Sequence, residues 1–190
     1  MTRLTRRIVL CLFLVHGIML GPVLGFEAES LSPLFEKARI TRIKRPKRAR
    51  DFVLPDVRGN PVRLADLRGR IVILSVWAMW CAPCRAEMAS IEGLHRRFRG
   101  RDVVVLAVSV DLSDIRVVRD FVERRGYTFT VLHDPRGDVM DLFQIRLIPA
   151  TYLIDKRGMI IGKAIGLRDW NDQAVTQLLV ELGKTRGDGP

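Results

Sequence analysis

The chain has 190 residues, which is enough for one domain of ordinary size and a short leader but leaves little for a second domain. Hydrophobic residues make up 48% of the sequence, so a core can form and wholesale disorder is excluded. The formal net charge of +11 raises nucleic acid or an anionic membrane surface as partners, but the basic residues are unevenly spread, which weakens the case for nucleic acid.

Residues 1–25 have the anatomy of a secretory signal. Three arginines precede an apolar run from Ile8 to Leu20, and a Gly-Pro break and small residues follow. The alternative is an uncleaved anchor, because the stretch from Ile8 to Phe26 is just long enough to cross the hydrocarbon core of a bilayer. In either case the rest of the chain is expected outside the cytoplasm, in the periplasm or on the outer face of the membrane. Cys11, inside this segment, is expected to behave as a small hydrophobic residue.

Residues 26–50 are predicted to form a basic linker, with a possible short helix from Ser32. The stretch from Arg39 to Arg50 contains seven basic residues and no acid. A solvated linker is one interpretation, and a strip attracted to anionic lipid head groups is the other. Because no aromatic residue is present to stack on bases, nucleic-acid binding is not expected.

Residues 51–183 alternate strand and helix patterns and predict one α/β domain with a central mixed sheet, followed by a flexible tail at residues 184–190. Gly59-Asn60 is a turn sequence and predicts a small hairpin. The continuous β-branched run from Ile71 to Val76 predicts a strand covered on both faces. The further elements expected are helices at 82–98, 114–125, 138–143 and 169–182, strands at 103–110 and 129–134, and a hairpin over 150–166.

Cys81 and Cys84 are the only cysteines after the leader, and they lie where the central strand gives way to a helix. A structural bridge is a poor explanation, because a loop of this length removes little entropy from the unfolded chain. A structural zinc site needs four ligands, yet there is no second Cys-x-x-Cys, and His95 and His133 are isolated. The pair therefore predicts redox chemistry with no metal and no cofactor.

The start of a helix stabilises a thiolate, because unpaired backbone N–H groups and the positive end of the dipole meet there. We therefore predict Cys81 as the nucleophile, with a pKa below the usual value of about 8.5. Cys84, one turn further on and more buried, is predicted as the resolving thiol. Trp80 is expected to lie partly exposed beside Cys81.

Glu87 and Pro149 each allow two interpretations. Glu87 either complements the helix dipole or faces the cysteines and moves the proton of Cys84. Pro149 either opens a strand, where proline is tolerated, or follows a cis peptide bond after Ile148.

The chain resembles the TlpA/ResA-like thioredoxin family of extracytoplasmic thiol-disulfide oxidoreductases, which are often membrane-tethered. The resemblance lies in the stretches "ARDFVLPDVRGNPVRLADLRGRIVILSVWAMWCAPCRAEM", "VVVLAVSVD", "LHDPRG" and "IPATYLIDKRGMIIGKAIG". The resemblance covers Ala49 to Leu182. It implies a thioredoxin fold, a three-layer α/β/α arrangement with an added N-terminal β-hairpin.

For the site, the resemblance implies that Cys81 is the nucleophile, Cys84 the resolving cysteine and Glu87 the acid near the pair. It also implies that Pro149 is a cis-proline facing the disulfide and that the backbone of Ile148 pairs with a bound substrate. Trp80 completes the predicted substrate-binding set.

Three positions depart from the family. Ser75 stands where cytoplasmic thioredoxins carry a buried Asp, so proton handling falls to Glu87 or water. Ala89 and Leu147 stand where the family often has Pro and Gly, and Leu147 changes the loop beside the expected substrate groove.

The function expected from this resemblance is reduction of protein disulfides, for example in cytochrome c maturation or at a copper-site protein, with electrons from a membrane partner. A peroxiredoxin-like peroxidase shares the fold, but "WAMW" replaces the Thr and Pro that would hold a peroxide. A non-enzymatic binding module is a third possibility, although a binding scaffold needs no paired thiols.

Overall fold

The structure is a computed structural model that describes residues 31–185. The predicted signal or anchor at residues 1–25, with Cys11, lies outside the described residues, as do residues 186–190 of the predicted tail. Within residues 31–185, no helix is long and apolar enough to cross a membrane.

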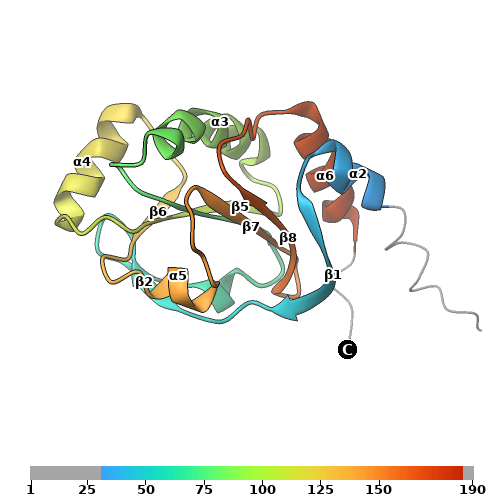
Figure 1. Ribbon diagram of the computed structural model, residues 1–190, viewed down its shortest axis with the longest axis horizontal. Coiled ribbons are helices and arrows are strands. Elements are labelled where there is room, and N and C mark those ends of the chain that lie inside the picture. Colours follow the sequence, from blue (N-terminus) through green and yellow to red (C-terminus); the bar gives the residue numbers. More distant parts are fainter. Residues whose placement is uncertain (1–30, 186–190) are drawn as a thin grey trace, which may run out of the picture. The chain divides into compact units, whose positions relative to one another are not determined.

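A six-stranded mixed sheet forms the centre of the fold, in the strand order β1-β8-β7-β4-β5-β6 (Figure 1). β4, β5 and β6 are parallel, whereas β7, β8 and β1 join by antiparallel pairing. The strands of this sheet are β1 (Thr41–Arg48), β4 (Ile71–Trp77), β5 (Val103–Ser109), β6 (Thr130–His133), β7 (Ala150–Ile154) and β8 (Met159–Ile165). The helices are α2 (Ser32–Lys37), α3 (Ala82–Phe98), α4 (Ile115–Arg125), α5 (Asp138–Leu142) and α6 (Gln173–Lys184), with a short 3-10 helix at Leu64–Leu67.

β4 is buried along its whole length, as its apolar sequence predicts. Successive side chains point to opposite faces, so Ile73 and Trp77 enter one core while Leu74 and Val76 enter the other. α3, α4 and α6 cover the first face; α5 and the hairpin of β2 (Val53–Pro55) and β3 (Pro61–Arg63) cover the second (Figure 1). The predicted three-layer fold with an added hairpin is therefore confirmed.

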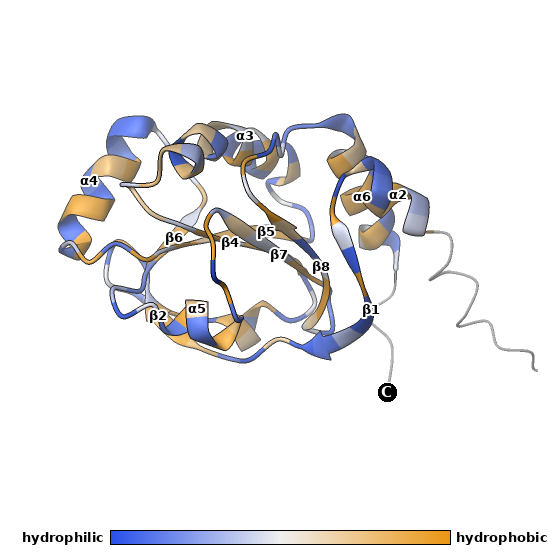
Figure 2. Cartoon of the chain, in the orientation of Figure 1, coloured by the Kyte–Doolittle hydropathy of each residue, from blue (hydrophilic) through white to orange (hydrophobic). Residues whose placement is uncertain are grey.

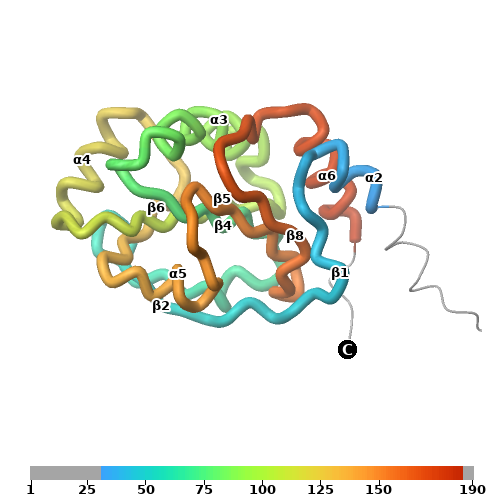
Figure 3. Tube along the Cα trace, in the orientation of Figure 1, coloured from blue at the N-terminus to red at the C-terminus, as the bar shows by residue number. Residues whose placement is uncertain are grey.

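Much of the described part of the predicted basic linker is instead regular structure, with α2 at Ser32–Lys37, where a short helix was expected, and β1 at Thr41–Arg48 in the sheet. β1 pairs antiparallel with β8, Arg42 lying opposite Gly162, and α2 lies beside α6 (Figure 3). Gly162 is required at this crossing, because a Cβ there would lie 2.9 Å from side-chain atoms of both Phe35 and Ile40. The side chains of β1 itself are largely exposed and charged, and part of this strand is therefore blue in Figure 2.

The final helix begins later than predicted. α6 starts at Gln173, and the side chain of Asp172 caps it by accepting the N–H of Ala174 at 2.6 Å. Residues 169–172 belong to the preceding loop, because Trp170 leaves the helical path to enter the core with 1% of its surface exposed. This loop brings Trp170 toward α3 and the cysteines.

Candidate active site

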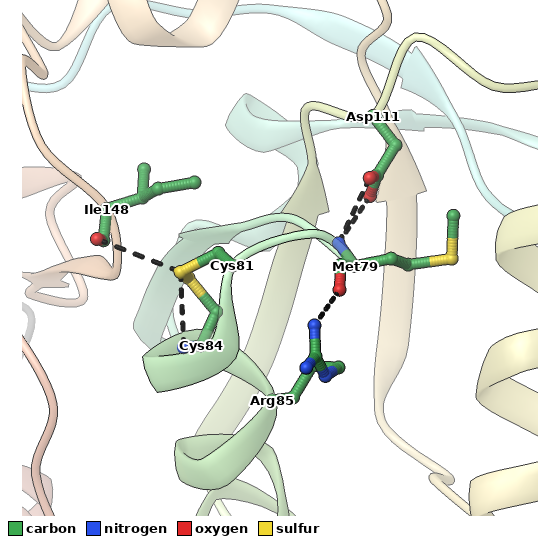
Figure 4. Close-up of a disulfide and its surroundings, with 6 residues drawn as sticks. All are labelled: Met79, Cys81, Cys84, Arg85, Asp111 and Ile148. Carbon is green, nitrogen blue, oxygen red and sulfur yellow. Dashed lines mark hydrogen bonds between the residues drawn. A yellow bond between two sulfur atoms is a disulfide. The ribbon is translucent and has the colours of Figure 1, made fainter.

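The redox pair lies where β4 ends and α3 begins, and the two sulfurs are joined in a disulfide (Figure 4). Cys81 is the N-cap of α3: its backbone is extended, and its Sγ accepts the N–H of Cys84 at 3.2 Å. Pro83 occupies the first turn, where a missing N–H costs no helical bond. One free N–H of the helix end is thus directed at the sulfur predicted to carry the charge.

The two sulfurs differ in access. Cys81 keeps 7% of its surface exposed and Cys84 keeps 1%, so a partner reaches Cys81 first. This difference fits the order of attack expected from the sequence, in which Cys84 acts only from within.

The loop that precedes β7 also lies beside the disulfide. The Ile148–Pro149 peptide bond is cis, as predicted, and the carbonyl oxygen of Ile148 lies 3.9 Å from the Cys81 Sγ (Figure 4). The carbonyl of Pro149 accepts the N–H of Gly166 at 2.8 Å, which holds this loop against the end of β8. The main chain of Ile148 is therefore held beside the reactive sulfur.

A buried carboxylate positions the turn before Cys81, and sequence reasoning missed it. Both oxygens of Asp111 accept the N–H of Met79, at 3.0 and 2.9 Å, and one also accepts the hydroxyl of Ser109 at 2.7 Å. On the other side, Arg85 donates to the carbonyl of Met79 (Figure 4). Asp111 lies two residues after the end of the buried strand β5, and that place at the carboxyl end of a strand was the available signal.

Glu87 is buried within the core, with 2% of its surface exposed. Its Oε1 accepts the indole N–H of Trp170, while its Oε2 is buried and receives no hydrogen bond from residues 31–185. Burial raises the pKa of Glu87 to about 7, although the Trp170 hydrogen bond and the charge of Arg168 act in the opposite direction. A carboxyl with this pKa can both take and release a proton at neutral pH.

The other predicted residues fall around this centre. Trp80 is 69% exposed next to Cys81, and Leu147 is equally exposed beside Ile148. Ser75 is buried on β4, opposite Thr151 of β7, and neither hydroxyl meets a hydrogen-bond partner among residues 31–185.

No three His, Cys, Asp or Glu side chains within residues 31–185 gather as they would around a metal ion. His133, at the end of β6, has its Nε2 3.1 Å from the carbonyl oxygen of Asp111, and His95 lies against Phe129 with ring centroids 6.2 Å apart. Both imidazoles thus have local packing roles.

Comparison with known proteins agrees with this geometry. The profile of the AhpC/TSA family matches residues 46–163. The chain belongs to this family. It is 31% identical to the thiol-disulfide oxidoreductase ResA of Bacillus thuringiensis over 164 residues, covering 86% of this chain and 88% of the relative. The ResA of Oceanobacillus iheyensis is 40% identical over 105 residues, covering 55% of this chain and 54% of the relative.

The solved structures agree on the fold. A thiol:disulfide interchange protein of the thioredoxin family from Chlorobium tepidum superposes with a TM-score of 0.63 at 25% identity, covering 72% of this chain and 99% of the other. The resemblance seen in the sequence is therefore confirmed, and the chain is a thiol-disulfide oxidoreductase with a thioredoxin fold.

Proposed function

We propose that this oxidoreductase reduces protein disulfides outside the cytoplasm, with Cys81 as the attacking sulfur and Cys84 as the resolving one. The observation that carries the proposal is the Cys81 Sγ at the start of α3, which accepts the Cys84 N–H at 3.2 Å and is the more accessible sulfur. Three steps follow from this placement.

In the first step, the Cys81 thiolate attacks one sulfur of a substrate disulfide, and the other substrate sulfur leaves as a thiolate that takes a proton from water. In the second, Cys84 loses its proton and attacks Cys81 Sγ. The Cys81–Cys84 disulfide forms as the mixed disulfide breaks, and the second substrate sulfur leaves as a thiolate that takes a proton from water, so the substrate is fully reduced. In the third, two electrons and two protons from a dithiol donor restore the Cys81–Cys84 pair. We assign the membrane partner expected from the sequence to this last step.

Glu87 is the proposed acceptor of the Cys84 proton. It follows Cys84 by three residues on α3 and thus lies on the same side of the helix. Its pKa of about 7 suits a proton acceptor working near neutral pH. Ser75 carries no acidic group, so the proton of Cys84 is assigned to Glu87, the carboxyl close to Cys84 in the sequence.

Ile148, Pro149 and Trp80 are the proposed substrate contacts. An extended substrate segment that approaches Cys81 would meet the main chain of Ile148 and pair with it as an added strand. Trp80, exposed next to Cys81 in the chain, would cover the apolar part of that segment. The proposed substrates are exported proteins whose cysteines must be reduced before haem or copper is attached.

The export proposal rests on the leader pattern of residues 1–25. An alkaline phosphatase fusion placed after residue 50 should be active, because that enzyme needs an oxidising compartment. An inactive fusion would remove the proposed location.

The direction and type of reaction can be tested together on the full chain. We expect a reduction potential nearer to about −270 mV than to about −120 mV, and rapid loss of both thiols on mixing with an oxidised two-cysteine peptide. A value near the oxidising end would contradict a reducing role. Thiol loss faster with hydrogen peroxide than with the peptide would favour the peroxidase alternative, and no turnover with either would favour a binding module.

The basic residues of β1 are the proposed contact with an anionic membrane surface. Lys44, Arg45 and Lys47 are exposed, and none forms a salt bridge with another residue of 31–185. Vesicles rich in anionic lipid should bind the chain and release it as salt is raised. A variant with Ala at these three positions should bind less, and equal binding by both would end this proposal.

A further inference from the structure

The loop between β8 and α6 carries an arginine that joins the back of the active site to the N-terminal segment. One terminal nitrogen of Arg168 donates to the carbonyl of Arg39 at 2.9 Å, and the other donates to the carbonyl of Ala38. These carbonyls follow α2, where Arg39 has a positive φ of 51°. The guanidinium therefore holds the turn from α2 into β1.

The same guanidinium lies over the indole of Trp170, with its central carbon 4.6 Å from the ring centroid. A cation at this distance is attracted to the face of the ring. The edge of that indole donates its N–H to Glu87. Arg168 thus acts on Glu87 both through the position of Trp170 and through its own charge.

α3 is attached to the same loop independently. The hydroxyl of Ser90 accepts the N–H of Trp170 at 3.0 Å and donates to the carbonyl of Glu87 at 2.7 Å. The backbone of Trp170 is therefore fixed without Arg168, while the orientation of its ring depends on what packs against the ring face. Removal of the guanidinium would release the ring before it released the loop.

We propose that Arg168 is a positioning residue for the thiol chemistry, because it packs on Trp170, keeps the indole N–H on Glu87 and favours the ionised carboxylate that accepts the Cys84 proton. The inference rests on the proposed role of Glu87. Arg168 lies 81 positions after Glu87 in the chain. Its assignment makes the α2–β1 turn part of the structure that supports the active site.

The charges around this pair are few. Among the described residues, the charge that acts on Glu87 is that of Arg168. Arg168 in turn faces Asp169 and Asp172 from its own loop and Arg39 from the α2–β1 turn. It also borders an open cavity of about 580 Å³, so a shorter side chain at this position leaves space that water can fill.

The test is the pH dependence of the resolution step in the full-length chain. The reduced protein is mixed with oxidised glutathione, and the decay of the glutathione–Cys81 mixed disulfide is followed by acid quench and mass spectrometry. For Arg168→Gln we expect the rising limb of the pH–rate profile to move to higher pH by about one unit. This is the lower end of the pKa shift that a nearby opposite charge causes in a carboxyl group. Arg168→Lys keeps the charge but not the paired contacts, and should move the limb by less.

Arg97→Gln is the matched control. Arg97 also donates to this part of the chain, to Asn171 of the loop at 2.7 Å and to Thr176 of α6 at 3.1 Å, but its charge does not act on Glu87. We expect its profile to overlay that of the unmodified chain. In a Glu87→Gln background, Arg168→Gln should have no further effect on the profile, since the group it acts on has been removed.

The outcomes separate the two proposals. If Glu87→Gln alone leaves the profile unchanged, the proposed role of Glu87 is wrong, and the Arg168 inference falls with it. If Glu87→Gln changes the profile and folded Arg168→Gln does not, only the Arg168 inference is overturned. If Arg168→Gln fails to fold, Arg168→Lys decides, and a profile identical to that of the unmodified chain overturns the inference.

Discussion

Replacing Glu87 with Gln should make the oxidised protein more stable than the unmodified chain at alkaline pH, and progressively less so toward acidic pH. Gln retains an oxygen that can accept the indole N–H of Trp170, so the hydrogen bond is kept. What changes is the charge, which Gln cannot carry into the core. The variant therefore isolates the cost of ionising a buried carboxyl.

The magnitude follows from the pKa. Burial raises the pKa of Glu87 from 4.5 to about 7, so the folded protein keeps a proton that the unfolded chain has already lost. The unfolded state then binds fewer protons, and stability falls as pH rises from about 4.5 until it levels off above about 7. Between pH 5 and pH 8.5 this loss amounts to about 2.5 kcal/mol.

The assay is urea unfolding of the oxidised full-length chain and of the variant at several pH values in this range. The quantity to compare is the difference in unfolding free energy between the two proteins, because other titrating groups cancel in it. We expect this difference to move in favour of Glu87→Gln by about 2 to 3 kcal/mol from pH 5 to pH 8.5.

Glu92→Gln, on the same helix, provides a control of opposite sign. Burial raises the pKa of Glu92, but hydrogen bonds from the N–H of Thr128 and from Arg96 outweigh it, and the net pKa is lowered. Its charge stabilises the fold above its usual pKa of 4.5, and that stability is lost only at lower pH. Glu92→Gln should therefore destabilise over the whole range from pH 5 to pH 8.5, and its pH dependence should come only from His95, whose pKa the charge of Glu92 raises. A pH dependence for Glu87→Gln no larger than that of Glu92→Gln would refute the reasoning about the burial and ionisation of Glu87.

Two further predictions concern β1 and α6, which the structure places differently from the sequence-based prediction. Gly162→Ala should lower the free energy of unfolding in urea by about 1 to 3 kcal/mol, because the new Cβ lies 2.9 Å from atoms of Phe35 and Ile40. The control is Gly183→Ala on α6, where a Cβ has nothing within 4 Å, and this variant should be neutral or stabilised by up to about 1 kcal/mol. Equal effects of the two substitutions would argue against the packing of the α2–β1 segment on β8. Asp172→Ala should cost about 1 kcal/mol by removing the cap of α6, whereas Asp172→Asn should cost less, and a neutral Ala variant would place the start of the helix elsewhere.

Most of the central domain could be predicted because its local signals agree with its tertiary role. The strand from Ile71 is apolar at every position, and the helix from Ala82 begins at a proline and a capping side chain. Such elements need no distant partner to be recognised. The hairpin around Gly59 carries its own turn signal, and Gly59 has a φ of 89°.

β1 could not be predicted from its own residues. It is an edge strand exposed along most of its length, so it shows no alternation of apolar and polar side chains. Its partner β8 lies more than 100 residues further along the chain, and only their pairing reveals it as a strand. The basic residues that suggested a solvated linker are compatible with a charged sheet edge.

The residues of the candidate site also differ in whether they could be predicted from the sequence. The cysteine pair and the loop at Pro149 carry short sequence signatures, and both lie where these predict. Trp170 and Asp111 have no such signature, because their roles depend on contacts with residues far from them in the chain. A tryptophan among charged residues, in "LRDWND", was the only hint that this loop turns inward.

The most direct test of the account is to capture the mixed disulfide. A Cys84→Ser chain, reduced and mixed with an oxidised two-cysteine peptide, should accumulate a one-to-one adduct that mass mapping locates at Cys81. Cys81→Ser should form such an adduct far more slowly, since Cys84 has only 1% of its surface exposed. An adduct at Cys84 that forms as fast as the one at Cys81 would contradict the assignment of Cys81 as the attacking sulfur.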